Sequence, residues 1–409
     1  KGKNITLEAS IASDASFGGV TGSIQQEAIN LALEKLDAPL NLSLAYVEAK
    51  GDAKVTLRPT AVLTASQDIS IAAMAERSAS AEVQTEGNNK LNLSAGFANV
   101  SGTTEVDIQS GAKLTAGGKV DLLAASKTTV SMSAAAAGET DEDTGQANVA
   151  SVVFAGSRSD VSTSVKVGAG AIISSVGDTR VQAYHIGQYE TSADVTVYGG
   201  GTAGVVGALS LQKSNTSVQV DGTVQAGGHV RVMAMNVAPK NVISATSANA
   251  TEEEESAKDA MGLPDSLELS QEDAAEGAQQ TLFEGFMSLT EAISEESEAA
   301  SSADGTDSTS DSKPPAFRLA GAMSWSESDH TTRAIVGANA RVTAGGDAVV
   351  DAQSLIGQLK SVTTSEATSE TEGENGSKIG LGVAFAYADH RVTTRADVGS
   401  GAQINAGHV

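Results

Sequence analysis

The feature that most constrains the fold of this chain is a motif that recurs along most of its length. The motif reads small–Gly–Ala, alternating apolar residues, an Ala-Gly-Gly turn and a second alternating segment, and its clearest copy is GAKLTAGGKVDLLAAS. Copies begin at Pro59, Gly111, Gly168, Gly222, Gly337 and Gly399, the last one ending with the chain at Val409. Repeats of this kind predict a solenoid, because each unit buries its apolar face only against its neighbours.

The residue before each turn measures the period of the repeat. These residues are Thr64, Thr115, Ser174, Gln225, Thr343 and Asn405, with spacings of 51, 59, 51, 118 and 62 residues. The spacing of 118 equals two periods or one period with an insertion, and the local sequence favours the insertion. A second motif lies between these copies, at 41–57, 92–108, 148–167, 204–220, 319–336 and 381–398. We interpret each copy as a strand, a polar corner and another strand.

Alternation within the repeats has the period of a β-strand. Val120, Leu122 and Ala124 are expected on one face, and the residues between them on the other. The Gly-Gly pairs at 117–118, 227–228 and 345–346 are expected to form left-handed or tight corners. The sequence therefore predicts an all-β, repetitive β-solenoid. We favour a parallel β-helix with two coils per repeat, about a dozen coils forming a rod about 60 Å long. A stack of antiparallel sheets is the alternative.

Composition narrows the possible functions. The net charge is −25 and the pI is near 4.5, which argues against binding to nucleic acid or to anionic lipid. Aromatic residues make up only 3% of the chain, fewer than the pocket of an enzyme usually needs. The chain lacks cysteine, and we find no apolar stretch long enough to insert into a membrane. Because it begins with Lys1, we expect an excised or processed fragment.

Segments rich in acidic residues interrupt the repeat. Residues 251–313 hold 18 acidic residues and 2 lysines. We expect a β-solenoid over 1–250, an acidic insertion that is partly helical and partly disordered over 251–315, and a continued solenoid over 316–409 that is truncated in mid-repeat. A shorter helical insertion is expected at about 22–38. With the acidic loops at 138–146 and 365–378, these insertions are predicted to enter at one corner of the coil.

The middle of the long insertion has the spacing of an amphipathic helix. Leu282, Phe286, Leu289 and Ile293 follow one another at steps of four, three and four residues. Because an isolated helix of this length is marginal in water, the apolar face needs a partner or the solenoid to pack on. The candidate partner-binding residues are Leu282, Phe283, Phe286, Met287, Leu289 and Ile293.

The paired motifs resemble the repeats of very large bacterial surface proteins. The segments are GA-x-φ-x-AGG-x-φ-x-φ-x-A-x-S and φ-x-GA-x-A-x-x-x-S, where φ is apolar, and the likeness covers nearly all of the chain outside 251–315. They are similar to leukotoxin-type filamentous adhesins and, more loosely, to filamentous haemagglutinin-like β-helices. The resemblance implies export, display at the cell surface, and adhesion or spacing. The resemblance implies no catalytic residue.

Two sets of residues are candidates for site chemistry. Asp329-His330 and Asp389-His390 look like a repeated catalytic pair. Their expected equivalents elsewhere are Asp160-Val161 and Asn215-Thr216, and this variety favours a turn position. Glu139, Asp141, Glu142 and Asp143 offer oxygen ligands for calcium, although neither known calcium-loop spacing is present.

The first hypothesis for function is therefore the structural shaft of a giant bacterial cell-surface adhesin or extracellular filament, which mediates attachment between cells or to a surface. Its partners would be neighbouring repeats or subunits at both ends, and another cell surface or the extracellular matrix. The alternative is a partner- or glycan-binding module that uses 270–296. An enzyme acting on polysaccharide is the third reading, and we expect no enzyme because the sequence lacks the hydrolase, metalloprotease and nucleotide-binding motifs.

Overall fold

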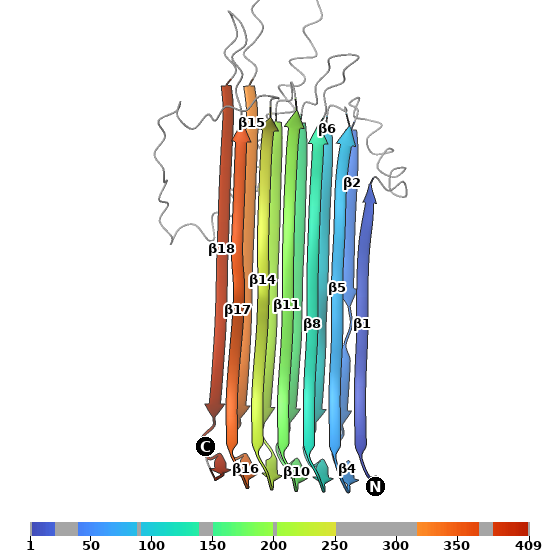
Figure 1. Ribbon diagram of the computed structural model, residues 1–409, viewed down its shortest axis with the longest axis vertical. Helices are drawn as coiled ribbons and strands as arrows, with labels where there is room; N and C mark the ends of the chain where they lie inside the picture. Colours follow the sequence, from blue (N-terminus) through green and yellow to red (C-terminus); the bar gives the residue numbers. More distant parts are fainter. Residues whose placement is uncertain are drawn as a thin grey trace, which may run out of the picture. The chain divides into compact units, whose positions relative to one another are not determined.

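The computed structural model describes residues 2–20, 40–87, 91–138, 150–198, 203–250, 317–367 and 379–407. These residues form one unit of three parallel sheets (Figure 1). The first long sheet contains β1 (Ile5–Val20), β5 (Ile69–Gly87), β8 (Val120–Gly138), β11 (Thr179–Tyr198), β14 (Val230–Ala250) and β17 (Ala348–Ala367). The second long sheet contains β2 (Leu40–Lys50), β3 (Ala53–Leu57), β6 (Leu91–Ile108), β9 (Ala150–Val167), β12 (Ala203–Val220), β15 (Phe317–Val336) and β18 (Ile379–Val398). The short sheet contains β4 (Val62–Ala65), β7 (Lys113–Ala116), β10 (Ile172–Ser175), β13 (Thr223–Ala226), β16 (Arg341–Ala344) and β19 (Gln403–Asn405).

The chain visits the three sheets in turn, so that each coil takes one stretch of strand from each sheet. This is the all-β parallel solenoid that the repeat predicts. The register agrees with the repeat residue by residue, since the six residues that precede the turns pair in one continuous column: Thr64, Thr115, Ser174, Gln225, Thr343 and Asn405. Gln225 pairs directly with Thr343, so the long spacing is one period with an insertion.

The predicted number of coils was wrong. Each repeat forms one coil, because the second motif is a single strand of 18 to 20 residues in β6, β9, β12, β15 and β18, without a polar corner. The short sheet has six strands, which at about 4.8 Å each stack over about 25–30 Å, not the expected 60 Å. The long strands run along the longest axis of the structure instead (Figure 1).

The core lies between the sheets and consists of two apolar clusters. Val120, Leu122 and Ala124 are buried as the alternation predicts. With their neighbours in the short sheet and the adjoining halves of the long strands, they form the first apolar cluster, which includes Leu114, Ile173, Val224 and Val342. The second apolar cluster lies farther along the long strands and includes Val83, Val100, Met132, Val195 and Ile243.

The Gly-Gly pairs serve close stacking, and the left-handed residues lie at another corner. A Cβ on Gly117 would overlap the carbonyl oxygen of Ser66 in the preceding coil, and Gly227 and Gly345 lie equally close to the backbone below them. None of these three has a positive φ, so of the two predicted forms these corners are tight and not left-handed. Apart from Gly102 within β6, the positive φ angles among the described residues occur before the short strands, at Thr60, Gly111, Gly170, Asn339 and Gly401. There the chain turns from the second long sheet into the short one.

Every expected insertion falls at one connection of the coil, as the sequence predicts. The segments 21–39, 88–90, 139–149, 199–202, 251–316 and 368–378 each join a strand of the first long sheet to the next strand of the second. These six segments lie outside the described residues. The coil resumes in β15 with Arg318–Ala322, as expected, and Leu319 pairs with Ala203. Among the described residues no helix is long and apolar enough to cross a membrane.

Candidate functional site

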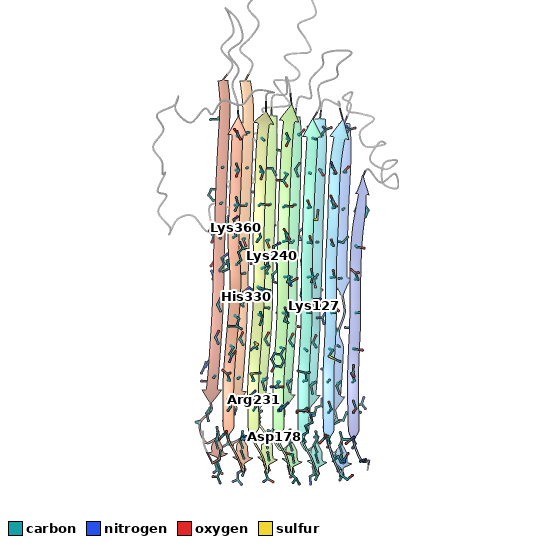
Figure 2. The ribbon with its side chains drawn as sticks, in the orientation of Figure 1. Lys127, Asp178, Arg231, Lys240, His330 and Lys360 are labelled. Atoms are coloured by element: carbon teal, nitrogen blue, oxygen red, sulfur yellow. The ribbon has the colours of Figure 1, made fainter. Side chains whose placement is uncertain are left out.

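The Asp329-His330 pair lies in the middle of the long strand β15, so its interpretation as a turn was wrong. His330 of β15, labelled in Figure 2, is 1% exposed and faces the interior between the sheets. Asp329 faces outward and is exposed. The register pairs Asp329 with Lys213 and His330 with Ser214, two residues before the expected Asn215-Thr216. The expected Asp160-Val161 pairs with the same Lys213 and Ser214, so that equivalence is confirmed. The corner before β13 has only Asp221 and Gly222, against four residues before β16, which explains this error.

His330 belongs to a polar seam, which we define as the inward-facing polar residues between the two apolar clusters. On the second long sheet, one column of the seam consists of Thr104, Thr163, Thr216 and Thr332. On the first long sheet, the facing column consists of Ser126, His185, Asn236 and Ser354. Apart from Ser354, all of these side chains are buried. The seam therefore crosses the interior of successive coils at the same level.

Hydrogen bonds of the seam join the two long sheets. The Ser126 and Thr163 hydroxyls are 2.5 Å apart, and the Thr332 and Ser354 hydroxyls are 2.8 Å apart. In the fourth and fifth coils, the Asn236 amide donates to Ser214 Oγ at 2.7 Å. The Ser214 hydroxyl lies 2.7 Å from His330 Nδ1. If Ser214 uses its hydrogen toward His330, the ring proton of His330 is on Nε2.

Three serine–histidine pairs occur in the seam. They are Ser126–His185, Ser214–His330 and Ser328–His390, with oxygen to Nδ1 distances of 2.8, 2.7 and 2.6 Å. A nucleophile and its general base have this separation. The three serine side chains are buried, however, so their oxygens are not open to a substrate. The arrangement accounts for hydrogen bonds between coils.

Burial controls the protonation of the two innermost histidines. It lowers the pKa of His185 to about 3 and that of His330 to about 4, so that both rings are neutral at physiological pH. Burial also raises the pKa of Tyr189 to about 12. The Tyr189 hydroxyl lies 3.3 Å from His185 Nε2. The seam therefore holds neutral groups at these positions.

Arg77 occupies the seam in the second coil. It is fully buried, donates to the carbonyls of Gly51 and Thr103 at 2.8 and 3.1 Å, and donates to Thr104 Oγ1 at 3.2 Å. Burial lowers its pKa, while the charge of Asp52 opposes that shift. The break between β2 and β3 falls beside it, at Gly51–Asp52. Arg77 thus provides donors to backbone oxygens where the adjoining strand is interrupted.

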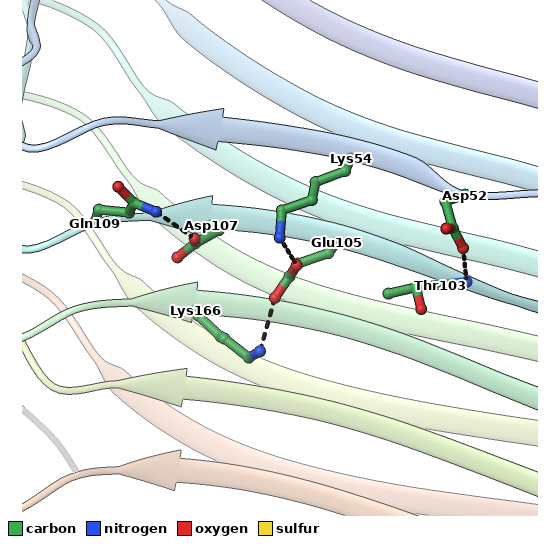
Figure 3. Close-up of polar contacts among 7 residues, drawn as sticks. All are labelled: Asp52, Lys54, Thr103, Glu105, Asp107, Gln109 and Lys166. Atoms are coloured by element: carbon green, nitrogen blue, oxygen red, sulfur yellow. Dashed lines mark hydrogen bonds and ion pairs between the residues drawn. The ribbon is translucent and has the colours of Figure 1, made fainter.

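The outward surface of the second long sheet has an apolar half and a charged half. In the charged half, Glu105 lies between Lys54 and Lys166, at 2.5 and 2.7 Å (Figure 3). Burial alone would raise the pKa of Glu105, but the two lysines outweigh it and the pKa is lowered. Asp52 accepts a hydrogen bond from the backbone N–H of Thr103 at 2.7 Å in the same region (Figure 3).

The apolar half covers the first part of the same strands, and we call it the apolar face. Its outward rows, in register, are Leu91–Ala150–Ala203–Leu319, Leu42–Leu93–Val152–Val205–Gly321, Leu44–Ala95–Phe154–Gly207–Met323 and Tyr46–Phe97–Gly156–Leu209–Trp325. Tyr387 of β18 stacks on Trp325, with ring centroids 4.1 Å apart, and extends the last row. This face was not predicted from the sequence, although the run of alternate Leu, Val and aromatic residues in the second motif is its signal.

The residues proposed for calcium and for partner binding are not placed by the structure. Glu139, Asp141, Glu142 and Asp143 lie outside the described residues, as do Leu282, Phe283, Phe286, Met287, Leu289 and Ile293. Within the described ranges, no group of three or more His, Cys, Asp or Glu side chains could hold a metal ion. No family model matches the chain, and neither the curated proteins nor the solved structures contain a significant match.

Proposed function

We propose that this chain is a structural shaft segment of a bacterial cell-surface adhesin or extracellular filament. The observation that supports this most is the unbroken stacking of six coils, in which the short strands pair in register from Thr64 to Asn405. Such a chain grows in length by adding coils, since each coil packs only on its neighbours. A structural spacer needs this capacity to be lengthened by repeating the same unit.

The partners in this proposal are further coils or subunits. β1 and β17 are the outermost strands of the first long sheet, and β2 and β18 are those of the second. Each such strand offers backbone donors and acceptors on its outer side, to which another strand can add. The tip of the assembled shaft would then contact another cell surface or the extracellular matrix.

Immunogold electron microscopy of the source cells tests the proposal. Antibodies raised against the full chain should label fibres outside the cell envelope, and a strain without the gene should be unlabelled. External protease should remove the label from intact cells. Label confined to the cell interior would overturn the proposal.

Mass measurement of the denatured native protein separates the two forms of shaft. A mass far above 41.1 kDa indicates one giant chain that contains this segment, and a mass near it indicates many subunits. In the second case the native protein should sediment as filaments. A monodisperse soluble monomer would contradict the shaft.

The alternative binding function stays a prediction, because residues 270–296 lie outside the described part of the chain.

A further inference from the structure

The sixth coil, which consists of β17, β18 and β19, leaves its interior open on the side away from the fifth coil. Leu359 is 37% exposed, whereas Asn241, its register partner in the fifth coil, is 1% exposed. The backbone N–H of Gly399 donates to the carbonyl of Val336 at 2.7 Å, so that Val398 continues the column of Val336. Val398 is 53% exposed and Val336 is fully buried. The same inward positions are therefore covered in the fifth coil and uncovered in the sixth.

Polar side chains of the seam lie on this open side. His390 Nδ1 is 2.6 Å from the hydroxyl of Ser328, and the Thr394 hydroxyl donates to Ser354 Oγ at 2.8 Å. None of the three sixth-coil side chains is buried. The residues beneath them in the fifth coil are polar and buried, namely Asn236, Ser328 and Thr332. We call the open side the C-terminal face and define it by Ser354, Leu359, His390, Thr394 and Val398.

The first coil has apolar residues where the sixth coil has polar ones. Three columns of the register connect the two coils. They begin at Ile11, Ala49 and Ala53, and they lead to Ser354, to Ser328 beneath His390, and to Thr332 beneath Thr394. The first coil is also more closed, since Ala49 and Ala53 are at most 2% exposed. The two outer coils of the solenoid therefore differ in both chemistry and exposure.

We infer that the C-terminal face docks a further parallel coil whose inward positions beside Ser354, His390 and Thr394 carry hydroxyl, amide or imidazole groups. This docking rests on the proposed shaft and identifies the partner at one of its two sides. The contacts between successive coils support it, because each junction from the third coil to the sixth joins a serine to a histidine: Ser126–His185, Ser214–His330 and Ser328–His390. A coil added in the same register continues this pattern and covers Leu359 and Val398.

A second copy of this chain, docked through its own first coil, does not fit the C-terminal face. It would place Ile11, Ala49 and Ala53 in the columns of the polar side chains. The buried hydroxyl and imidazole groups would then lose water without gaining a partner, which is unfavourable. The face therefore selects a coil with a polar seam. Such a coil can belong to the same giant chain or to another protein of the shaft.

Chemical modification of His390 tests this docking on two extended forms of the full chain. One form carries a copy of the fifth coil at its C-terminal side, residues 230–250 and 317–344. The other carries a copy of the first coil, residues 5–20 and 40–65, with the same glycine-serine linker inside each copy. Diethyl pyrocarbonate acylates accessible imidazoles, and mass spectrometry of peptides locates the product. The fifth-coil copy should slow the acylation of His390 about tenfold, and the first-coil copy should leave its rate unchanged. Protection by both copies, or by neither, would overturn the inference.

Three other histidines serve as internal controls. The His229 side chain is 60% exposed and should react in every form. His185 and His330 are buried and should stay unreactive. If an extended form misfolds, these two histidines react, and the native fibre then decides the question.

In fibres released from the source cells, His390 should be protected while His229 reacts. A denatured mass far above 41.1 kDa places the covering coil in the same chain, and a second protein in the fibre assigns it to that protein. Equal reactivity of His390 in the fibre and in the isolated chain would overturn the inference. Filaments built from this chain alone would also overturn it, because a second copy would then cover the face. In both cases the labelling of fibres on cells, and with it the proposed shaft, would still stand.

Discussion

The first apolar cluster and the polar seam are both largely buried and are stacked from the same coils, yet different forces hold them. In the cluster, Leu114, Ile173 and Val224 follow one another in a column, and one aliphatic side chain replaces another. In the seam, Ser214 meets a particular amide and a particular ring, those of Asn236 and His330. The cluster stabilises the fold through buried apolar area, and this interaction is non-directional. The seam stabilises it through hydrogen bonds, which are directional.

The comparison indicates what each region contributes to folding. A shift of one long strand by two residues keeps the same side chains facing inward, so much of an aliphatic column tolerates it. The same shift in the seam would separate hydroxyl from hydroxyl and leave buried polar groups unpaired. We therefore expect the cluster to contribute most of the stability and the seam to contribute most of the register. The predictions below test this division.

The largest effect is expected in the cluster. Leu114→Ala removes a fully buried side chain from this inward-facing column of the short sheet and should lower the free energy of unfolding by about 3 kcal/mol. Urea denaturation followed by circular dichroism measures this loss. Leu114→Met keeps the volume and should lose about 1 kcal/mol or less. Equal losses in the two variants would show that this column is not close-packed.

A smaller loss is expected when a hydroxyl is removed from the seam. Ser214→Ala leaves the Asn236 amide and His330 Nδ1 without their shared partner and should lower the free energy of unfolding by about 2 kcal/mol. The control is Ser217→Ala, whose side chain points outward from the same strand and should change stability by less than about 0.5 kcal/mol. Indistinguishable losses of stability in Ser214→Ala and Ser217→Ala would contradict the role of the seam in fixing the register.

Acid should weaken the seam before it weakens the cluster. The folded pKa of His330 is about 4, below its ordinary value of 6.5, so the unfolded chain takes up the proton first as the pH falls. The contribution of neutral His330 to the free energy of unfolding therefore decreases as the pH falls from 6.5 to 4 and then levels off. About 1 kcal/mol is lost by pH 5.5. In urea titrations, His330→Asn should lessen the slope of stability against pH in this window. The outward-facing control Ser217→Ala should keep the wild-type slope, and an unchanged slope in His330→Asn would contradict the assignment.

The repeat predicts the stacking because its turn has a fixed length. The segment from the small residue through Ala-Gly-Gly varies little, so residues such as Thr115 and Ser174 align without a gap. The second motif has no such landmark. Its corner differs in length between coils, and the alignment of Asp329-His330 was therefore displaced by two residues.

The seam could not be predicted because polarity in a sequence usually marks a loop. Ser214 and His330 read as a turn along the chain, and only the pairing of distant strands shows that their hydrogen-bonding groups face one another. The apolar face escaped prediction for a related reason. Alternate apolar residues on both sides of a strand look like one buried strand, and the sequence does not say which side meets the core.

The smallest effect is expected on the outer surface, where charges pair between coils. Lys127 of β8 contacts Glu76 of β5 at 2.7 Å, and both side chains are more than half exposed. Because water screens this pair, Lys127→Met should change the free energy of unfolding by about 0.3 kcal/mol and lose that effect in 1 M salt. Lys166→Met is the sharper comparison, since its partner Glu105 has a side chain only 8% exposed and lies between two lysines. It should lose about 1 kcal/mol, because part of a buried carboxylate's compensation is removed. Urea denaturation at low and high salt measures both variants. If Lys127→Met lost as much as Ser214→Ala, outward ion pairs would hold the register as firmly as the seam does, and the division between inner and outer columns would fail.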